Sequence, residues 1–261
     1  MTVGEAKDAR PAAVQLTERD LRGLLFTADM YGLQADLLAG RLGLREDAAR
    51  RVVARWRRLG YVESARLGPG PPWTWLTRRG LTACGLRYPA APPALSRLAH
   101  IRAVTAVRLA LESAPSYQQA GAYWRSERRI RARMGGRVGL REHLPDAEIH
   151  FPHGPGSPFA DECWAVEAEL TRKTVRRTTE IMRELLARTG DYGGPAAGVI
   201  VPGQPPRHAR VLYLCSAAAR PTVTRAAGEL GGLAARIEIR DLPPSAAMGG
   251  DTTAPRERAR P

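Results

Sequence analysis

The chain has 261 residues, enough for one large or two modest domains, and its formal net charge of +14 favours a polyanionic partner, most commonly nucleic acid. Lys7 and Lys173 are its only lysines, so part of this arginine-dominated charge also reflects the codon bias of a high-GC genome. Cys84, Cys163 and Cys215 lack metal-finger spacing, and no apolar run approaches the roughly 20 residues of a membrane span, so a cytoplasmic protein without a membrane partner is expected.

The first half begins with a polar segment, residues 1–15, which is expected to be disordered. Thr17 and Asp20 then form the pattern of a capping box, which predicts a helix starting at that point. Further helices are predicted over 34–42 and 46–59. In the latter, Val52, Val53 and Trp56 form an apolar stripe.

The helix predicted over 46–59 carries arginines at helical spacing. Arg51, Arg55 and Arg58 fall at i, i+4 and i+7 on one face, and Arg50 lies beside them. A hairpin over 61–76 and a short helix over 77–85 follow, so the order resembles a winged helix-turn-helix over residues 16–87 whose third helix enters the major groove. The alternative is that the Arg50–Arg58 segment is only the solvated face of an amphipathic helix.

A proline-rich linker, residues 88–94, is predicted to separate this unit from an α/β domain over 95–242. A helix is expected over 95–113, a short strand or helix over 123–131, and a basic loop over 133–141. Within 123–131, Glu127 either adds an acid to a site or pairs with Arg128 or Arg131.

The strongest chemical signal is a pair of acidic strands. In the first, Asp146, Glu148 and His150 alternate with apolar residues, and in the second Glu167 and Glu169 do the same. Pairing the strands as a hairpin could bring Asp146 near Glu167 and Glu169, where a divalent cation such as Mg²⁺ or Mn²⁺ would relieve their repulsion. The alternative is a solvated strand face paired with arginines.

A basic helix is predicted over 171–188, and its Arg172, Arg176 and Arg177 are candidates for holding DNA phosphates. A loop over 190–208, in which Val199–Val201 could form a short strand, precedes a strand over 211–215, a helix over 217–233, a strand over 237–242 and a disordered tail over 243–261. His150 and His153 can ligate metals, but their position beside a Pro/Gly turn favours exposure.

These blocks carry a resemblance. Pro145-Asp146, Glu167-Ala168-Glu169 and Thr171-Arg172-Lys173 resemble the PD-(D/E)xK nuclease-like core. Together with Trp124–Arg128, they are similar to the replication-relaxation family of actinobacterial plasmids and integrative elements, over roughly residues 16–242. The resemblance implies a winged helix joined to a restriction-endonuclease-like domain, with Asp146, Glu167, Glu169, Lys173 and Glu127 as candidate catalytic residues and the first three as metal ligands.

One departure from the nuclease pattern bears on activity. Such enzymes carry a lysine two residues after the strand acid, and the corresponding positions here are Glu169 and Thr171. Either Lys173 enters the site from the next segment, or Glu169 serves as a third metal ligand, or the site is inactive and only binds DNA.

Two classes of function follow. In the first, the chain binds double-stranded DNA of a plasmid or mobile element in replication or transfer, with or without Mg²⁺-dependent cleavage. In the second, it is a transcriptional regulator whose C-terminal half serves dimerisation or protein contact. A homodimer is left open by the sequence.

Overall fold

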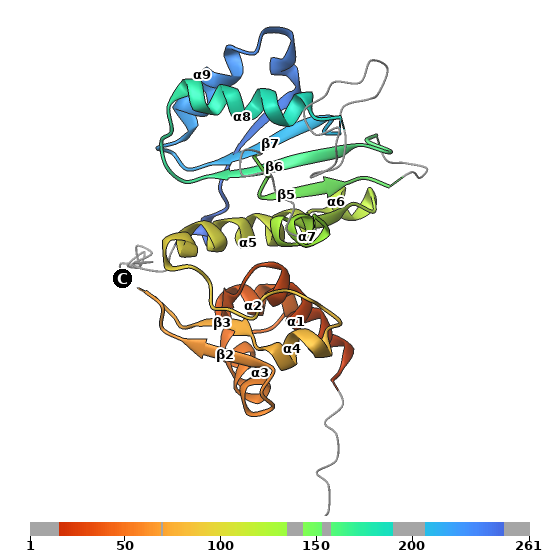
Figure 1. The fold of residues 1–261 in the computed structure, drawn as a ribbon, viewed down its shortest axis with the longest axis vertical. Coiled ribbons are helices and arrows are strands. Elements are labelled where there is room, and N and C mark those ends of the chain that lie inside the picture. Colours follow the sequence, from red (N-terminus) through yellow and green to blue (C-terminus); the bar gives the residue numbers. More distant parts are fainter. Residues whose placement is uncertain (1–15, 69, 135–142, 153–157, 190–206, 248–261) are drawn as a thin grey trace, which may run out of the picture.

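The computed structural model describes residues 16–68, 70–134, 143–152, 158–189 and 207–247. It is a mixed α/β protein, as the sequence predicts, and it is built in layers (Figure 1). Helices α8 and α9 lie on one side of a five-stranded sheet, and α5 lies on the other side. The N-terminal unit, residues 16–87, packs beneath α5.

The N-terminal unit combines four helices with a small antiparallel sheet of order β1-β3-β2. The elements are α1 (Glu18–Asp29), β1 (Leu33–Gln34), α2 (Ala35–Leu42), α3 (Glu46–Arg58), β2 (Val62–Ala65), β3 (Trp73–Leu76) and α4 (Arg78–Ala83). The predicted capping box is confirmed, because Thr17 and Asp20 exchange hydrogen bonds at the start of α1. Gly43 ends α2 with a φ of 63°, a left-handed conformation that favours glycine.

The larger sheet has the strand order β4-β5-β6-β7-β8. Its strands are β4 (Tyr123–Ser126), β5 (Ala147–His150), β6 (Cys163–Glu169), β7 (Arg210–Cys215) and β8 (Ile237–Asp241). The first three are antiparallel and the last three are parallel, which requires crossover helices. The helices of this half are α5 (Leu98–Glu112), α6 (Pro115–Gln119), α7 (Glu127–Arg133), α8 (Val175–Ala187) and α9 (Arg220–Gly228), with 3₁₀ turns η1 (Leu95–Arg97), η2 (Gly231–Arg236) and η3 (Pro244–Ala246).

The alternation predicted for β6 is confirmed. Trp164, Val166 and Ala168 face the core shared with α5, whereas Ala165 faces the core beneath α8 and α9. The acidic face of β6 is nevertheless covered, since Glu167 and Glu169 are only 5% and 6% exposed. The alternative of a solvated strand face is therefore wrong for these two glutamates, because the crossover helices lie over that side of the sheet.

Helix α5 joins the two halves of the chain, because one continuous core contains residues of the N-terminal unit, α5 and the sheet. Buried arginines cross the same junction. Arg102 binds Asp36 of α2 at 2.6 Å, and Arg128 donates to the Ala28 carbonyl at 2.6 Å. Tyr88, within the predicted linker, is buried in this core. The halves are thus held together by apolar packing and by the hydrogen bonds of Arg102 and Arg128.

Two sequence predictions need correction. The tail is not disordered from residue 243 onward, because η3 packs on α5 and the Ala247 carbonyl accepts a hydrogen bond from buried Arg102. The basic helix begins at Val175 and not at Thr171, because Thr174 caps it. Residues 1–15, 135–142, 248–261, His153 and Val199–Val201 lie outside the described residues. Across the described ranges, every helix is too short or too polar to span a membrane.

Candidate functional site

The predicted carboxylates meet where β5 begins and β6 ends. Ala147 pairs with Val166 in the antiparallel register, so Asp146, one residue earlier, lies opposite Glu167, one residue later. Oδ2 of Asp146 accepts a hydrogen bond from the Ala168 N–H at 2.8 Å, which continues the contact between the two strands beyond the first residue of β5. The geometry therefore gathers Asp146, Glu167 and Glu169 at one end of the sheet.

Each of these carboxylates contacts a basic side chain. Nε2 of His100 lies 2.6 Å from Oδ1 of Asp146, and Nε2 of His143 lies 2.7 Å from Oε1 of Glu167. The ammonium of Lys173 lies 2.5 Å from Oε2 of Glu169. The sequence analysis missed both histidines as site residues. His143 stands three residues before Asp146, which was a usable signal, whereas His100 comes from α5, far away in sequence.

Lys173 enters the site from the segment between β6 and α8. Of the three alternatives left by the sequence, this is the one in which Lys173 enters the site from the next segment. Its ion-pair partner is Glu169, the second acid of Glu167-Ala168-Glu169, and not Glu167, the first. The side chain is 39% exposed, so its ammonium remains accessible to solvent or to a ligand. A lysine in this position can contribute a positive charge next to the acidic pair.

Burial controls the proton balance of the site. Burial raises the pKa of Glu167 to about 7, and the charge of Asp146 adds to the rise, while His143 and Lys173 oppose it. Burial alone would lower the pKa of His143, but the charge and hydrogen bond of Glu167, together with the charges of Asp146 and Glu184, outweigh burial and raise the pKa. The pKa of His100 is raised in the same way by its hydrogen bond to Asp146, again against burial. Near neutral pH, Glu167 and His143 thus form a pair poised to take up or release a proton.

The residues fit a hard divalent cation in chemistry but are not arranged around one point. Carboxylate oxygens are the ligands Mg²⁺ prefers, and Glu167 and Glu169 each have one oxygen without a hydrogen bond or ion pair among the described residues. However, among the residues that the structure describes, the carboxylate oxygens of Asp146, Glu167 and Glu169 do not all lie within 4.8 Å of one another. A cation held by Glu167 and Glu169 would compete with His143 and Lys173.

Glu127 was predicted either to add an acid to the site or to pair with an arginine, and in the structure it pairs with arginines. It accepts hydrogen bonds from Arg97 at 2.7 Å and from Arg131 at 2.8 Å, whereas Arg128 binds elsewhere. Its backbone N–H donates to the Asp146 carbonyl, so Glu127 adjoins the site. Its carboxylate, shared by two guanidinium groups, positions these arginines.

No protein-family model matches the chain, and no curated protein resembles it significantly.

A second charged cluster surrounds Glu148, the second residue of β5. Glu148 is completely buried and its carboxylate contacts Arg125, Arg207, His150 and His208. His150 ends β5 and is 17% exposed, so the prediction that it is exposed in a turn is wrong. Its side chain packs against Glu148 on the polar side of the strand.

Glu148, Cys163 and His208 lie within 4.8 Å of one another, which is compatible with a metal ion. Two features favour an ion-pair network instead. The guanidinium groups of Arg125 and Arg207 occupy the Glu148 oxygens and repel a cation, and against the effect of burial the hydrogen bonds from His150, His208 and Arg207 hold the pKa of Glu148 below its ordinary range. Burial also raises the pKa of the Cys163 thiol, which disfavours the thiolate that binds metals.

The predicted arginines of α3 do not share one environment. Arg50, Arg51 and Arg58 are exposed, the first two paired with Glu46 and Asp47 of the preceding turn. Arg55 instead contacts Asp20 of α1, which is 1% exposed and also accepts the Trp56 indole N–H at 2.9 Å. Arg55 therefore anchors α3 to α1.

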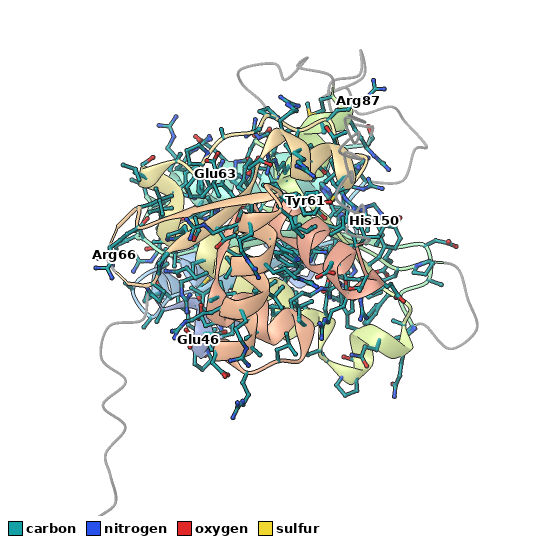
Figure 2. The ribbon with its side chains drawn as sticks, turned by 90° about the horizontal axis from the view of Figure 1, so that it is seen from below. Glu46, Tyr61, Glu63, Arg66, Arg87 and His150 are labelled. Atoms are coloured by element: carbon teal, nitrogen blue, oxygen red, sulfur yellow. The ribbon has the colours of Figure 1, made fainter. Side chains whose placement is uncertain are left out.

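Two grooves flank the β2–β3 hairpin on the side of α3. One, of about 670 Å³, is lined by Arg57 and Arg58, and the other, of about 540 Å³, by Arg50 and Arg66. Figure 2 looks onto this unit and shows Arg66 projecting at its edge. Arg57 and Arg66 were not among the predicted DNA-binding residues. Arg57 lies off the stripe of Arg51, Arg55 and Arg58 on α3, and Arg66 follows β2. Among the described residues, Glu63 is the only acidic one that lines either groove.

The remaining basic candidates lie near the start of α8. Arg172 donates to the Thr222 hydroxyl at 3.3 Å, and Arg176 and Arg177 both contact Glu180. All three arginines are exposed. Such partly neutralised guanidinium groups can still exchange a surface carboxylate for a phosphate, since exposed ion pairs are weak.

Proposed function

We propose that the chain binds double-stranded DNA through its N-terminal unit, which acts as a winged helix-turn-helix. Helix α3 would lie in the major groove, and the β2–β3 hairpin would contact the adjacent backbone. The C-terminal α/β half would be a nuclease-like domain. This two-part architecture and the sequence resemblance together support membership of the replication-relaxation family of plasmids and integrative elements, which we propose for the chain.

The observation that carries the proposal is the pair of arginine-lined grooves between α3 and the hairpin. Arg57 and Arg58 are exposed and make no ion pair among the described residues, so their positive charge is available to phosphates. Arg50 and Arg66 extend the positive surface around the hairpin. Four arginines that line two concave surfaces form a positive surface suited to a phosphate backbone.

The test is the salt dependence of binding to a duplex of mixed sequence, measured by fluorescence anisotropy. Replacing Arg57 and Arg58 with alanine should weaken binding and reduce the slope of log K against log salt by about 0.9 for each phosphate that is no longer neutralised. Arg19 and Arg22, exposed on α1 and outside the residues lining both grooves, provide a control with the same change of charge. Equal losses of affinity in both double variants would show that net charge alone drives binding.

A second candidate function, metal-dependent cleavage of phosphodiester bonds, is favoured by the gathering of Asp146, Glu167, Glu169 and Lys173. A bound divalent cation would neutralise phosphate charge and lower the pKa of a water ligand. Glu167 and Glu169 would hold it, Asp146 would fix the strand ends through the Ala168 N–H, and Lys173 would contribute positive charge to the phosphate.

Cleavage is tested by incubating supercoiled DNA with the protein and Mg²⁺ or Mn²⁺. Lys173→Ala should abolish nicking and leave duplex affinity within about twofold, because Lys173 is remote from α3 along the chain and belongs to the other half. Nicking that survives in Lys173→Ala and in Glu167→Gln would be contamination. Binding without nicking by the wild-type protein would contradict the cleavage candidate and leave the C-terminal half as an inactive DNA-binding domain or, as in the regulator alternative, a domain for protein contact.

A further inference from the structure

A pocket of about 560 Å³ lies between the residue 87–94 segment, α5 and α7. This volume is within the range of small-molecule sites in proteins. Its walls include Tyr31, Tyr88, Ile101 and the ring of Pro92. The pocket is separate from the two grooves beside α3, and nothing in the DNA-binding argument uses it.

The polar part of the lining is entirely basic in charge. Arg87, Arg97, Arg128 and Arg131 line the pocket, and its described lining includes no carboxylate. Glu127, just outside, holds Arg97 and Arg131 at 2.7 and 2.8 Å. The side chains of Arg97 and Arg131 are partly exposed, at 38% and 44%, and each guanidinium has more donors than Glu127 occupies, so both can also bind an anion. Arg87 is exposed and projects from the edge of the molecule (Figure 2).

The apolar part of the lining includes two tyrosine rings, prolines, alanines and Ile101. The guanidinium of Arg128 lies 4.8 Å from the ring centre of Tyr31 and 4.6 Å from that of Tyr88, and that of Arg97 lies 5.4 Å from the ring centre of Tyr31, so the two rings are fixed by arginines. Tyr31 has a φ of 62°, a left-handed conformation that is unfavourable for a non-glycine residue. The chain thus places a tyrosine, at some cost, where a glycine would normally follow a helix.

Rigid flat walls and convergent arginines suit a ligand with a planar ring and an anionic group. We propose that this pocket binds a nucleoside phosphate, with its base against the tyrosine and proline rings and its phosphate on Arg87, Arg97 and Arg131. The source is either a free mononucleotide or an unpaired nucleotide of a DNA strand. Tyr31, Arg97 and Ile101 also line a small cavity that contains Asp146 and His100, so a strand held here would lie beside the carboxylate cluster.

Isothermal titration calorimetry with the full chain tests the proposal. The probes are deoxyadenosine monophosphate, deoxyadenosine, inorganic phosphate, and hairpin duplexes with a blunt end or a 5′ single-stranded overhang. Ala132→Phe places a ring in the pocket from α7, and Ala110→Phe is the matched control on an exposed position of α5. Arg87→Glu reverses one wall charge without touching Glu127.

Deoxyadenosine monophosphate should bind at least about tenfold more tightly than phosphate or the nucleoside, since both parts contribute. Ala132→Phe and Arg87→Glu should each weaken it about tenfold or more, and Ala110→Phe should not. Preference for the overhang over the blunt duplex, abolished in Ala132→Phe, identifies a strand as the source. Phosphate binding as tightly as the nucleotide, or no binding of either nucleotide source, overturns the proposal, as does an unaffected Ala132→Phe. The outcomes with deoxyadenosine monophosphate, deoxyadenosine and phosphate do not depend on Arg57 and Arg58, so they are distinguishable from a failure of duplex binding in the grooves.

Discussion

Replacing Arg55 separates the structural arginine of α3 from those that face the grooves. Arg55 contacts Asp20, whose carboxylate is 1% exposed and also accepts hydrogen bonds from Trp56 and Thr17. Arg55→Ala leaves that carboxylate with its hydrogen bonds but without its counterion. The loss of one charge-assisted bond to a buried group corresponds to about 1–3 kcal/mol. Arg58→Ala, at an exposed position, should change the free energy of unfolding by about 0.5 kcal/mol or less.

Urea unfolding followed by tryptophan fluorescence measures this difference, because Trp56 contacts the same carboxylate. For a chain of this size, the expected loss is equivalent to roughly 2–4 °C in Tm for each kcal/mol. Under conditions where both variants are folded, Arg55→Ala should retain duplex affinity better than Arg58→Ala does. If Arg55→Ala is as stable as the wild type and loses DNA affinity as Arg58→Ala does, the assignment of Arg55 to the α1–α3 contact is refuted.

Three further predictions concern the C-terminal half. Mg²⁺ should raise the Tm more at pH 8 than at pH 6, because the cation competes with a proton on Glu167, whose pKa is raised to about 7, and Glu167→Gln should remove this pH dependence in a thermal shift assay. Glu148→Gln should lower the unfolding free energy by about 3–5 kcal/mol at neutral pH, because Glu148 is completely buried and Arg125 and Arg207, each 13% exposed, lose their anion. Since the pKa of Glu148 is lowered in the folded state, the difference from wild type should persist above about pH 5 and shrink as the pH falls, in urea titrations across pH. Ending the chain at Leu242 should cost about 1–3 kcal/mol by calorimetry, because Arg102, 5% exposed, loses the Ala247 carbonyl.

Local patterns in the sequence were sufficient for several elements. The capping box at Thr17 and Asp20 specifies the start of α1 by contacts three residues apart. The alternation in β6 specifies which residues face each side of the sheet, since that period is a property of the strand itself. It could not show that the acidic side is covered. The cover comes from α8, which follows β6, and from α9, which follows β7, and only the parallel pairing of β6 with β7 fixes the side of the sheet on which they lie.

The contacts that were missed are long-range. Helix α3 contains five arginines, and periodicity treats them alike, whereas the orientation of Arg55 depends on Asp20, 35 residues away. His100 reaches Asp146 across 46 residues. The segment Pro243–Ala247 looked like part of a tail because it has a small, turn-rich composition. Ala246 is nevertheless small enough to pack closely on α5, and a composition argument does not capture that fit.

The central claim, that duplex DNA lies in the grooves between α3 and the β2–β3 hairpin, is tested most directly by site-specific photocrosslinking. A benzophenone amino acid at Ala54, which lines the groove of Arg57 and Arg58, or at Ala65 on the hairpin should crosslink to bound duplex. The same group at Ala110, exposed on α5, should not. Crosslinking at Ala54 and Ala65 that disappears at high salt is the predicted result. Crosslinking at Ala110 with none at Ala54 or Ala65 would contradict the account.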